Sequence, residues 1–272
     1  MTHGPVDLSI VIVAYNSTPW LPDCLESLRK AEAPARRELF VVDNASTDGS
    51  ADLVRERFPE ARLLRNARNL GYARAVNRAW REAAGRHLLV LNPDVVVRPD
   101  ALARLHGHLE RNPRTGLVAP RLWNTDGSVQ ASSRTHYTMA TYALRRTPLA
   151  RIFPDHPIVR RHLMADWDRD EVRAVDWVLG AAMMMRREAI GATVMDERYF
   201  IYFEDVDLCV RLQQEGWQVV YDPSAEMVHH HRRASAGGFL NRRKYEHFKS
   251  WIKFNLKHAG TARGGERESV RP

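Results

Sequence analysis

Short apolar runs alternate with helical patterns over the N-terminal third of the chain, and this alternation constrains the fold more than any other feature. The runs are Leu8–Ala14, Leu39–Val42, Leu63–Leu64 and Leu88–Leu91. Between them lie leucines at helical spacing after Pro19 and two helical segments, Ser50–Phe58 and Tyr72–Ala84. Strands that are apolar at nearly every position are buried on both faces, which is typical of a parallel sheet. The pattern therefore predicts an α/β fold with helices on both faces of the sheet.

The remainder of the 272 residues is organised less regularly. Residues 123–175 show little periodicity, and we interpret them as a long excursion that carries substrate contacts. A second strand–helix–strand stretch follows between Val178 and Tyr221. We therefore expect one domain over residues 1–236, followed by a basic amphipathic helix and a frayed tail over residues 237–272.

Polar residues follow three of the apolar runs. Open sheets of this kind bind ligands beyond the carboxyl ends of their strands, so these residues are candidates for a binding site. Tyr15 and Asn16 follow the first run, Asp43 the second, and Asn92 and Asp94 the fourth. Asp43 can accept hydrogen bonds from a base or ribose, and Asp94 can join a Mg²⁺ or Mn²⁺ ion to a diphosphate. The alternative interpretation of both sites is a turn, because each contains strong turn formers.

An acidic cluster follows an aromatic run. Glu204 and Asp205 come directly after the five large apolar residues 199–203. Such surroundings raise the pKa of a carboxyl group and suit a general base. Asp207 is four residues before Arg211 on the predicted helix, so we interpret these two residues as a surface ion pair.

His229 opens a run of three histidines that follows the last predicted strand. An imidazole at this place can complete the coordination of an ion held by Asp94. The alternative is a solvated basic loop, because two arginines continue the run. The spacing of a dedicated zinc site is missing.

Positive charge is concentrated near the end of the chain. Lys and Arg number 41 against 33 Asp and Glu, and residues 223–272 hold 11 of the former and 4 of the latter. Residues 242–257 carry aromatic side chains and lysines at helical spacing. This helix fits either an interfacial contact with an anionic membrane or packing against the domain with solvated lysines. The localised charge and the lack of a recognisable module argue against a nucleic-acid partner.

Several features indicate the compartment and exclude protein classes. Two cysteines, Cys24 and Cys209, cannot form a disulfide framework and favour a reducing environment. No apolar run approaches the roughly 20 residues of a membrane-spanning helix, and the first residues lack the pattern of a signal peptide. We therefore expect a cytoplasmic protein. Glycine-rich dinucleotide loops, Walker loops and nucleophile elbows are missing from the sequence, which argues against dehydrogenases, ATPases and α/β-hydrolases.

Six stretches together carry a family resemblance. They are Ser9–Asn16, Val42–Ser50, Asn69–Asn77, Leu91–Asp94, Asp196–Leu208 and Pro223–His230. In this order they resemble the family 2 glycosyltransferases, inverting enzymes of the GT-A fold, and more narrowly their rhamnosyltransferase-like branch. The resemblance implies a GT-A-type, Rossmann-like fold with a mixed, mostly parallel central sheet and a C-terminal amphipathic helix. It also implies a nucleotide-sugar half at about residues 1–122 and an acceptor half at about 123–236, the excursion matching least.

The resemblance implies roles for individual residues of the donor site. Asp43 stands where the family reads the nucleotide base, and Asn69 and Asn77 stand where side chains line the donor site. Tyr15 and Asn16, which follow the first strand, belong to the same expected set.

The resemblance also implies the metal ligands and the base. Asp94 matches the last acid of the family's Asp-x-Asp motif, and His229 matches a histidine that can reach the metal or diphosphate. Asn92 replaces the first acid, which removes one negative charge from the expected Mg²⁺ or Mn²⁺ site. Asp205 matches the general base, with Glu204 beside it as the second candidate.

The expected activity is transfer of a sugar, foremost L-rhamnose from dTDP-L-rhamnose, to a hydroxyl of a cell-envelope glycan or lipid-linked acceptor. The protein would then work in the cytoplasm, at the inner face of the membrane if the tail helix binds lipid. The alternatives are another nucleotide-sugar donor in the same fold, a metal-dependent nucleotidyltransferase, and a non-catalytic sugar-nucleotide binding module.

Overall fold

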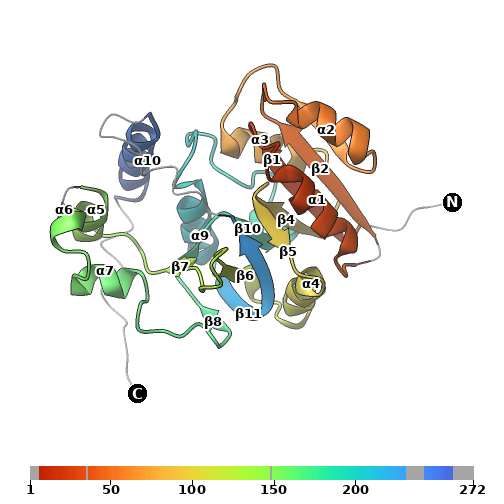
Figure 1. Ribbon diagram of the computed structural model, residues 1–272. Helices are drawn as coiled ribbons and strands as arrows, with labels where there is room; N and C mark the ends of the chain where they lie inside the picture. Colours follow the sequence, from red (N-terminus) through yellow and green to blue (C-terminus); the bar gives the residue numbers. More distant parts are fainter. Residues whose placement is uncertain (1–5, 35, 148, 231–241, 260–272) are drawn as a thin grey trace.

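The computed structural model describes residues 6–34, 36–147, 149–230 and 242–259, and Figure 1 shows its helices and strands. The strands are β1 Leu8–Ala14, β2 Arg37–Asp43, β3 Arg62–Arg65, β4 His87–Leu91, β5 Val95–Val97, β6 Thr115–Trp123, β7 Ser133–Arg134, β8 Arg173–Ala174, β9 Trp177–Val178, β10 Ala182–Arg186 and β11 Gln218–His229. The helices are α1 Leu21–Lys30, α2 Ser50–Arg57, α3 Tyr72–Trp80, α4 Ala101–Arg111, α5 Met139–Arg146, α6 Leu149–Ile152, α7 Pro157–His162, α8 Arg187–Ile190, α9 Glu204–Gln214 and α10 Arg242–His258.

The central sheet confirms the predicted α/β class. Within the described residues it has nine strands, eight of them in the order β3-β2-β1-β4-β10-β6-β11-β5, while β8 pairs with β11. Strands β1 to β4 are parallel, and β10 runs antiparallel to both β4 and β6. The sheet is therefore mixed and mostly parallel, as the resemblance implied. Its parallel half places the ends of β1, β2 and β4 at one edge, where the predicted polar residues follow.

Alternate residues of the strands enter two different cores. In β1, Val11 and Val13 pack with α3 and α9, whereas Ile10 and Ile12 pack on the other face with α1 and α4. Because both faces of the strand are covered, every side chain of β1 is buried. This arrangement explains the unbroken apolar run in the sequence.

The pairing of the last long strand brings the two predicted metal ligands together. β11 pairs antiparallel with β5, and His229 lies opposite Val95. Val95 directly follows Asp94, so the end of β11 lies beside the turn after β4. β4 itself lies between β1 and β10, which places this turn in the interior of the sheet.

The excursion forms a separate layer of short elements. Helices α5, α6 and α7 lie with α10 on one side of the molecule, away from α1 and α2 (Figure 1). Tyr142 of α5 stacks on Trp251 of α10 with ring centroids 4.1 Å apart. β7 pairs with β9 and connects this layer to the central domain.

Helix α10 contacts the domain through the buried carboxylate of Asp207. Asp207 is completely buried and accepts hydrogen bonds from Arg211 at 3.0 Å and His258 at 2.9 Å, while Lys257 lies 2.7 Å away. Lys257 is also 2.7 Å from Asp196. The predicted ion pair of Asp207 and Arg211 is therefore present, but the prediction that it lies on the surface is wrong, because α10 covers the carboxylate. Removing one partner from such a buried pair typically costs about 3–5 kcal/mol.

None of the described helices is long and apolar enough to cross a membrane. Cys24 and Cys209 are both buried free thiols. The predicted boundary at residues 236–237, the end of the histidine run at His231 and the frayed tail beyond residue 259 lie outside the described residues. The predicted division into domains stays a prediction.

Candidate active site

The loop after β2 is held in place by an asparagine that the sequence analysis did not single out. Asn44 is buried, and its side-chain Nδ2 donates to Asn69 Oδ1 at 2.9 Å. Its Oδ1 accepts from Asn66 Nδ2 at 2.9 Å and from the Leu70 N–H at 3.0 Å. One amide thus joins the loop after β2 to the loop before α3.

Asp43 lies at the end of β2, beside Ala14 at the end of β1. Its Oδ1 accepts a 3.3 Å hydrogen bond from the Ser46 N–H, and the side chain is 2% exposed. Ala45, between these two residues, has a φ of 65°, which is unusual for a residue with a Cβ. Backbone strain of this kind is concentrated at binding and catalytic sites.

Tyr15 and Asn16 flank the same loop. The Tyr15 side chain is 52% exposed at the carboxyl end of β1, and Asn16 Oδ1 accepts from the Thr47 N–H at 2.9 Å. Asn16 itself has a φ of 50°. The structure therefore brings Tyr15, Asn16 and Asp43 to one edge of the sheet, and it leaves the aromatic ring of Tyr15 accessible to a ligand.

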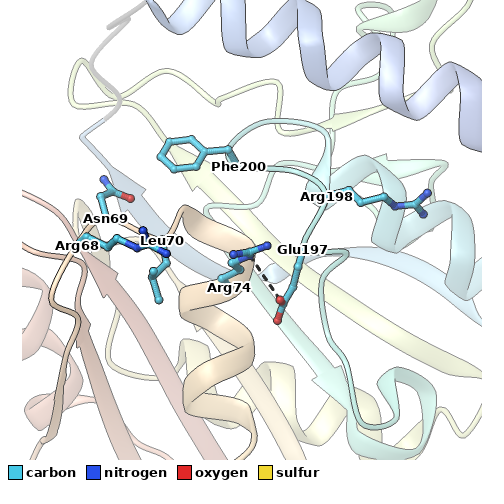
Figure 2. A pocket seen from close by; sticks show the side chains of 7 residues that line it. All are labelled: Arg68, Asn69, Leu70, Arg74, Glu197, Arg198 and Phe200. Carbon is cyan, nitrogen blue, oxygen red and sulfur yellow. Dashed lines mark ion pairs between the residues drawn. The ribbon is translucent and has the colours of Figure 1, made fainter.

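Asn69 occupies the rim of a small open pocket of about 300 Å³ next to this edge. Figure 2 shows the lining, in which Arg74 pairs with Glu197 at 3.5 Å. The pocket does not include Asp43, Asp94 or Asp205. Gly71 permits the close approach of Phe200, which lines the pocket, because a Cβ at residue 71 would lie 2.6 Å from the Phe200 carbonyl oxygen.

Asn77 is not among the residues that line this pocket, and its role in the donor site stays a prediction. The side chain is 1% exposed, and its Oδ1 accepts from the Met195 N–H at 3.0 Å. Its Nδ2 donates to the Met195 carbonyl at 2.8 Å and to Glu197 at 3.2 Å. The amide oxygen and the amide nitrogen of Asn77 therefore both bind the segment Met195–Glu197, which precedes the aromatic run.

Asp94 and His229 meet as the pairing of β5 with β11 requires. His229 Nε2 lies 3.4 Å from Asp94 Oδ1, and His229 Nδ1 lies 2.9 Å from Gln130 Oε1. His229 is buried, whereas a quarter of the Asp94 side chain is exposed. A carboxylate oxygen beside an imidazole nitrogen held by an outer hydrogen bond suits a divalent cation such as Mn²⁺.

Asn92 lies in the same turn, two residues before Asp94. Its Oδ1 accepts from the Tyr72 hydroxyl at 3.1 Å, and this hydroxyl also lies 3.3 Å from the Gly180 carbonyl. The amide oxygen of Asn92, which replaces the first acid of Asp-x-Asp, thus already accepts a hydrogen bond from a residue of the protein. Asp94 and His229 remain as the residues that fit an ion.

Glu204 and Asp205 begin helix α9 in buried surroundings. Burial raises the pKa of both carboxyl groups, and the proximity of Asp205 raises the pKa of Glu204 further. Asp205 Oδ2 accepts from the Gly180 N–H at 3.0 Å, whereas Glu204 Oε2 is buried without a hydrogen-bond partner among the described residues. Tyr202 and Phe203, which precede them, both have a φ of 69°. Asp205 is therefore the better oriented of the two candidate bases.

Tyr72 lies between the candidate metal ligands and the candidate bases: its hydroxyl contacts Asn92 Oδ1 and the Gly180 carbonyl, and the Gly180 N–H donates to Asp205. The pKa of its hydroxyl is raised well above the usual value by burial, and then by the charges of Glu204, Asp205 and Asp94. One phenol is thus within electrostatic reach of all three carboxylates. Tyr72 was not predicted as a site residue. The sequence signal that could have identified it is its position at the start of a helix, directly after Asn69–Gly71.

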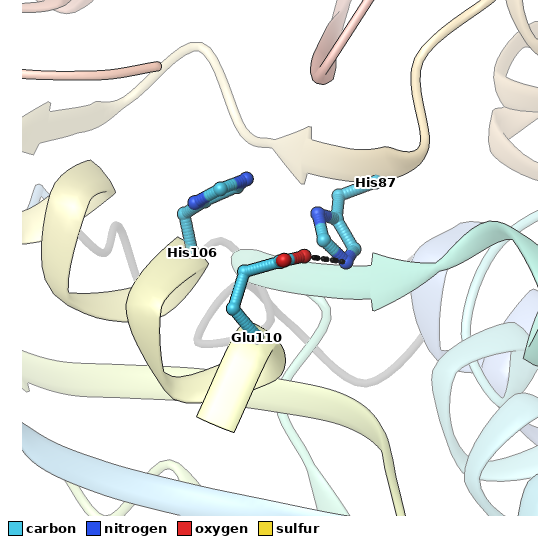
Figure 3. Close-up of side chains that lie close together, drawn as sticks. All are labelled: His87, His106 and Glu110. Atoms are coloured by element: carbon cyan, nitrogen blue, oxygen red, sulfur yellow. Dashed lines mark ion pairs between the residues drawn. The ribbon is translucent and has the colours of Figure 1, made fainter. Parts of the chain in front are cut away.

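A second group of potential metal ligands lies elsewhere (Figure 3). One ligand atom each from His87, His106 and Glu110 lies within 4.8 Å of the others. Burial lowers the pKa of His87 to about 4 and also lowers the pKa of His106, so both imidazoles are neutral at pH 7. His87 begins β4, whereas Asp94 follows its end. This group is therefore separate from the crevice.

The comparisons with known proteins show the family of this chain. The family model described as "Glycosyl transferase family 2" matches residues 9–167. The N-acetylglucosaminyl-diphospho-decaprenol L-rhamnosyltransferase of Mycobacterium tuberculosis is 34% identical over 97% of this chain and 89% of its own length. Rhamnosyltransferase WbbL of Escherichia coli is 25% identical over 66% of this chain and 65% of its own length. The chain belongs to the family 2 glycosyltransferases.

Solved structures support the same fold. A crystal structure of GalNAc-T7 with UDP, GalNAc and Mn²⁺ superposes with a TM-score of 0.65 at 16% identity, covering 93% of this chain and 48% of the other. The protein is thus a glycosyltransferase of GT-A architecture, and its central sheet and C-terminal helix are those implied by the sequence resemblance.

Proposed function

We propose that this enzyme transfers L-rhamnose from dTDP-L-rhamnose to a hydroxyl of a lipid-linked cell-envelope glycan, with inversion at the anomeric carbon. The observation that carries the proposal is the chain of contacts through the Tyr72 hydroxyl, which joins the turn that holds Asp94 to Gly180, the partner of Asp205. A displacement needs a base at one end and charge stabilisation at the other, and this crevice supplies both. The choice of rhamnose is supported by the names of the two relatives.

The residues divide the reaction between them. The Asp205 carboxylate takes the proton of the acceptor hydroxyl while the oxygen forms a bond to the anomeric carbon. The bond from that carbon to the diphosphate oxygen breaks on the opposite face, which inverts the configuration. The Gly180 N–H orients Asp205, and Asp43 and Tyr15 lie where the nucleoside would bind. The surrounding core excludes water, which would otherwise compete as acceptor.

Asp94 and His229 would hold a divalent metal ion. When bound, such an ion stabilises the negative charge of the departing nucleoside diphosphate. Because the site offers one carboxylate and one imidazole, it fits Mn²⁺ better than a cation that takes oxygen ligands alone, since imidazole suits transition metals.

A donor panel tests the proposal. Purified enzyme with Mn²⁺ and a prenyl-diphosphate-linked acceptor is incubated with dTDP-L-rhamnose, UDP-glucose or UDP-N-acetylglucosamine. We expect dTDP-L-rhamnose to be used at least about 10-fold faster, which corresponds to one or two specific sugar contacts. Phosphorus NMR should show release of dTDP. Equal use of a UDP-sugar would assign another donor, and release of pyrophosphate would indicate nucleotidyl transfer.

We also propose that α10 meets the membrane that carries the acceptor. Tyr245, Phe248 and Leu256 are exposed on this helix, and Met139 and Ile152 are exposed on the neighbouring α5 and α6. Exposed apolar residues gathered in this way indicate an interaction surface. Of the lysines expected to meet lipid, Lys257 is instead paired with Asp196 and Asp207, so Lys249 is left as a better placed candidate.

Liposome flotation tests this contact with point variants. Truncation before Arg242 would also remove Lys257 and His258, two partners of the buried Asp207, so a loss of flotation could result from a loss of stability. The double variant Phe248→Ser, Leu256→Ser should reduce flotation with anionic liposomes at least about 10-fold, because two large apolar side chains no longer enter the interface. Val172→Ser, at an exposed position outside this surface, should float like the wild type. Unchanged flotation of the double variant would remove α10 from the contact.

A further inference from the structure

Three arginines of the excursion surround one tyrosine hydroxyl. Arg134 comes from β7, and Arg145 and Arg146 end helix α5. Arg145 Nη1 donates to the Tyr137 hydroxyl at 3.3 Å, and Arg134 and Arg146 also interact with this hydroxyl. Although burial alone would raise it, the pKa of Tyr137 is lowered by the three guanidinium groups. We refer to Arg134, Arg145 and Arg146 as the arginine cluster.

The arginine cluster has no acidic partner in ion-pair contact within the described part of the chain. Arg134 lies 5.0 Å from the Trp177 ring centroid, and Arg145 donates to His162 Nε2 at 2.9 Å. Burial and then Arg134 lower the pKa of Arg145 to about 10. The charge of Asp205 acts on Arg134, so three positive charges face one carboxylate at a distance, which indicates a site that a negatively charged ligand completes.

Two buried hydroxyls beside the cluster have no hydrogen-bond partner. Ser132 and Ser133 are 2% and 0% exposed, and the Oγ atom of each is unpaired among the described residues. Ser133 adjoins Arg134 in β7 and Ser132 directly precedes it, so both residues are close to the cluster along the chain. Unsatisfied buried donors are uncommon and call for an explanation, which a phosphate oxygen would provide.

The cluster lies next to the proposed base. Arg134 is paired with Trp177 across β7 and β9, and the chain continues from β9 to Gly180, whose N–H binds Asp205. In agreement with this placement, the Arg134 guanidinium lowers the pKa of Asp205. The donor diphosphate would lie with Asp94 and His229 at the other end of the crevice. The cluster therefore faces the side from which the acceptor must approach.

We propose that the arginine cluster binds the diphosphate group of a prenyl-diphosphate-linked acceptor and so positions its sugar hydroxyl at Asp205. This inference rests on the proposed glycosyl transfer. Guanidinium groups bind phosphate oxygens through paired hydrogen bonds, and several of them match the charge of a diphosphate. Exposed Met139 on α5 and Phe248 on α10 offer apolar surface for the prenyl chain on the same side of the molecule.

The test uses geranyl diphosphate as the probe and keeps dTDP and Mn²⁺ at saturation, so that the donor site is filled. Calorimetry on the full-length enzyme should show binding of geranyl diphosphate, weaker binding of inorganic pyrophosphate and none of geraniol. Arg146→Gln, at an exposed position, and Arg134→Gln should each weaken binding of geranyl diphosphate by about 10-fold or more, because each removes a charge-assisted hydrogen bond. Arg161→Gln, an exposed arginine of α7 outside the cluster, makes the same charge change and should bind as the wild type.

The outcomes separate this inference from the proposed function. Binding of dTDP should be the same in all variants, and thermal melting reports whether each is folded. If Arg134→Gln does not fold, Arg134→Lys takes its place and should retain part of the affinity. Competition between dTDP and geranyl diphosphate would assign the cluster to the donor, and unchanged affinity of Arg146→Gln and Arg134→Gln would overturn the inference. Failure of the wild type to bind dTDP would contradict the proposed function itself.

Discussion

Replacing Asp205 by Asn is expected to lower the rate of sugar transfer by about 10²–10⁴-fold, the usual contribution of a positioned base. The amide keeps the shape of the side chain and an oxygen that can accept the Gly180 N–H at 3.0 Å, so the fold and the binding of dTDP should not change. Single-turnover rates and thermal stabilisation by dTDP measure the two quantities separately. Wild-type turnover in this variant would exclude Asp205 as the base.

Glu204→Gln is the matched control for this variant. Glu204 is the adjacent buried carboxyl group, but its Oε2 has no hydrogen-bond partner among the described residues, whereas Asp205 Oδ2 accepts from the Gly180 N–H. We expect a loss of less than about 10-fold, well below that of a base. A larger loss for Glu204→Gln than for Asp205→Asn would transfer the role of base to Glu204.

The dependence of kcat/KM on pH tests independently whether Asp205 is the general base. Burial raises the pKa of Asp205, and the active form is the carboxylate, so kcat/KM should fall as the pH drops through this raised pKa. The Arg134 guanidinium lowers the pKa of Asp205. Arg134→Gln should therefore move the acid limb of the profile to higher pH, whereas a purely structural role for Arg134 would leave the limb in place.

Replacing Asp94 by Asn is expected to abolish most of the metal-dependent activity. It removes the carboxylate that lies 3.4 Å from His229, and a Lewis acid typically contributes several kcal/mol of transition-state stabilisation, equivalent to at least about 100-fold in rate. Initial rates over a Mn²⁺ titration measure the effect. Asp100→Asn, which changes a surface pair with Arg104, is the control and should titrate like the wild type.

Asn92→Asp makes the opposite change at the same turn. Restoring the first acid of Asp-x-Asp adds a negative charge, and an aspartate can still accept the Tyr72 hydroxyl. The Mn²⁺ concentration for half-maximal activity should fall by about 10-fold, because an added carboxylate ligand strengthens binding of a hard cation. Wild-type activity that persists after chelation, together with no response of Asp94→Asn, would contradict a metal at this site.

The parts of the site that follow directly from strand ends could be predicted from the sequence. A buried parallel strand reads as an apolar run, and the residue after the run must lie at the carboxyl edge of the sheet. Asp43 and Asp94 were placed correctly on this basis. The burial of Asn77 against Met195 could not be predicted, because the sequence shows that a residue lies on a helix but not which way its side chain points.

The surroundings of the charged residues were also beyond sequence reasoning. The spacing of Asp207 and Arg211 correctly predicted an ion pair, but only the packing of α10 buries it. Arg134 and Arg146 belong to an excursion without periodicity, so nothing in the sequence indicated that they meet at Tyr137. Contacts between segments far apart in the chain depend on how helices and strands pack, which local patterns do not encode.

The sequence alone determined the class of fold, the family and the identity of most of the residues at the edge of the sheet, because these depend on local periodicity and on short motifs. The tertiary structure decided which of these residues share a crevice. The antiparallel pairing of β5 with β11 brings His229 to Asp94, and the start of α9 brings Asp205 to Gly180. Such long-range pairings are selected by burial of the whole core, so they become visible only when the chain is folded.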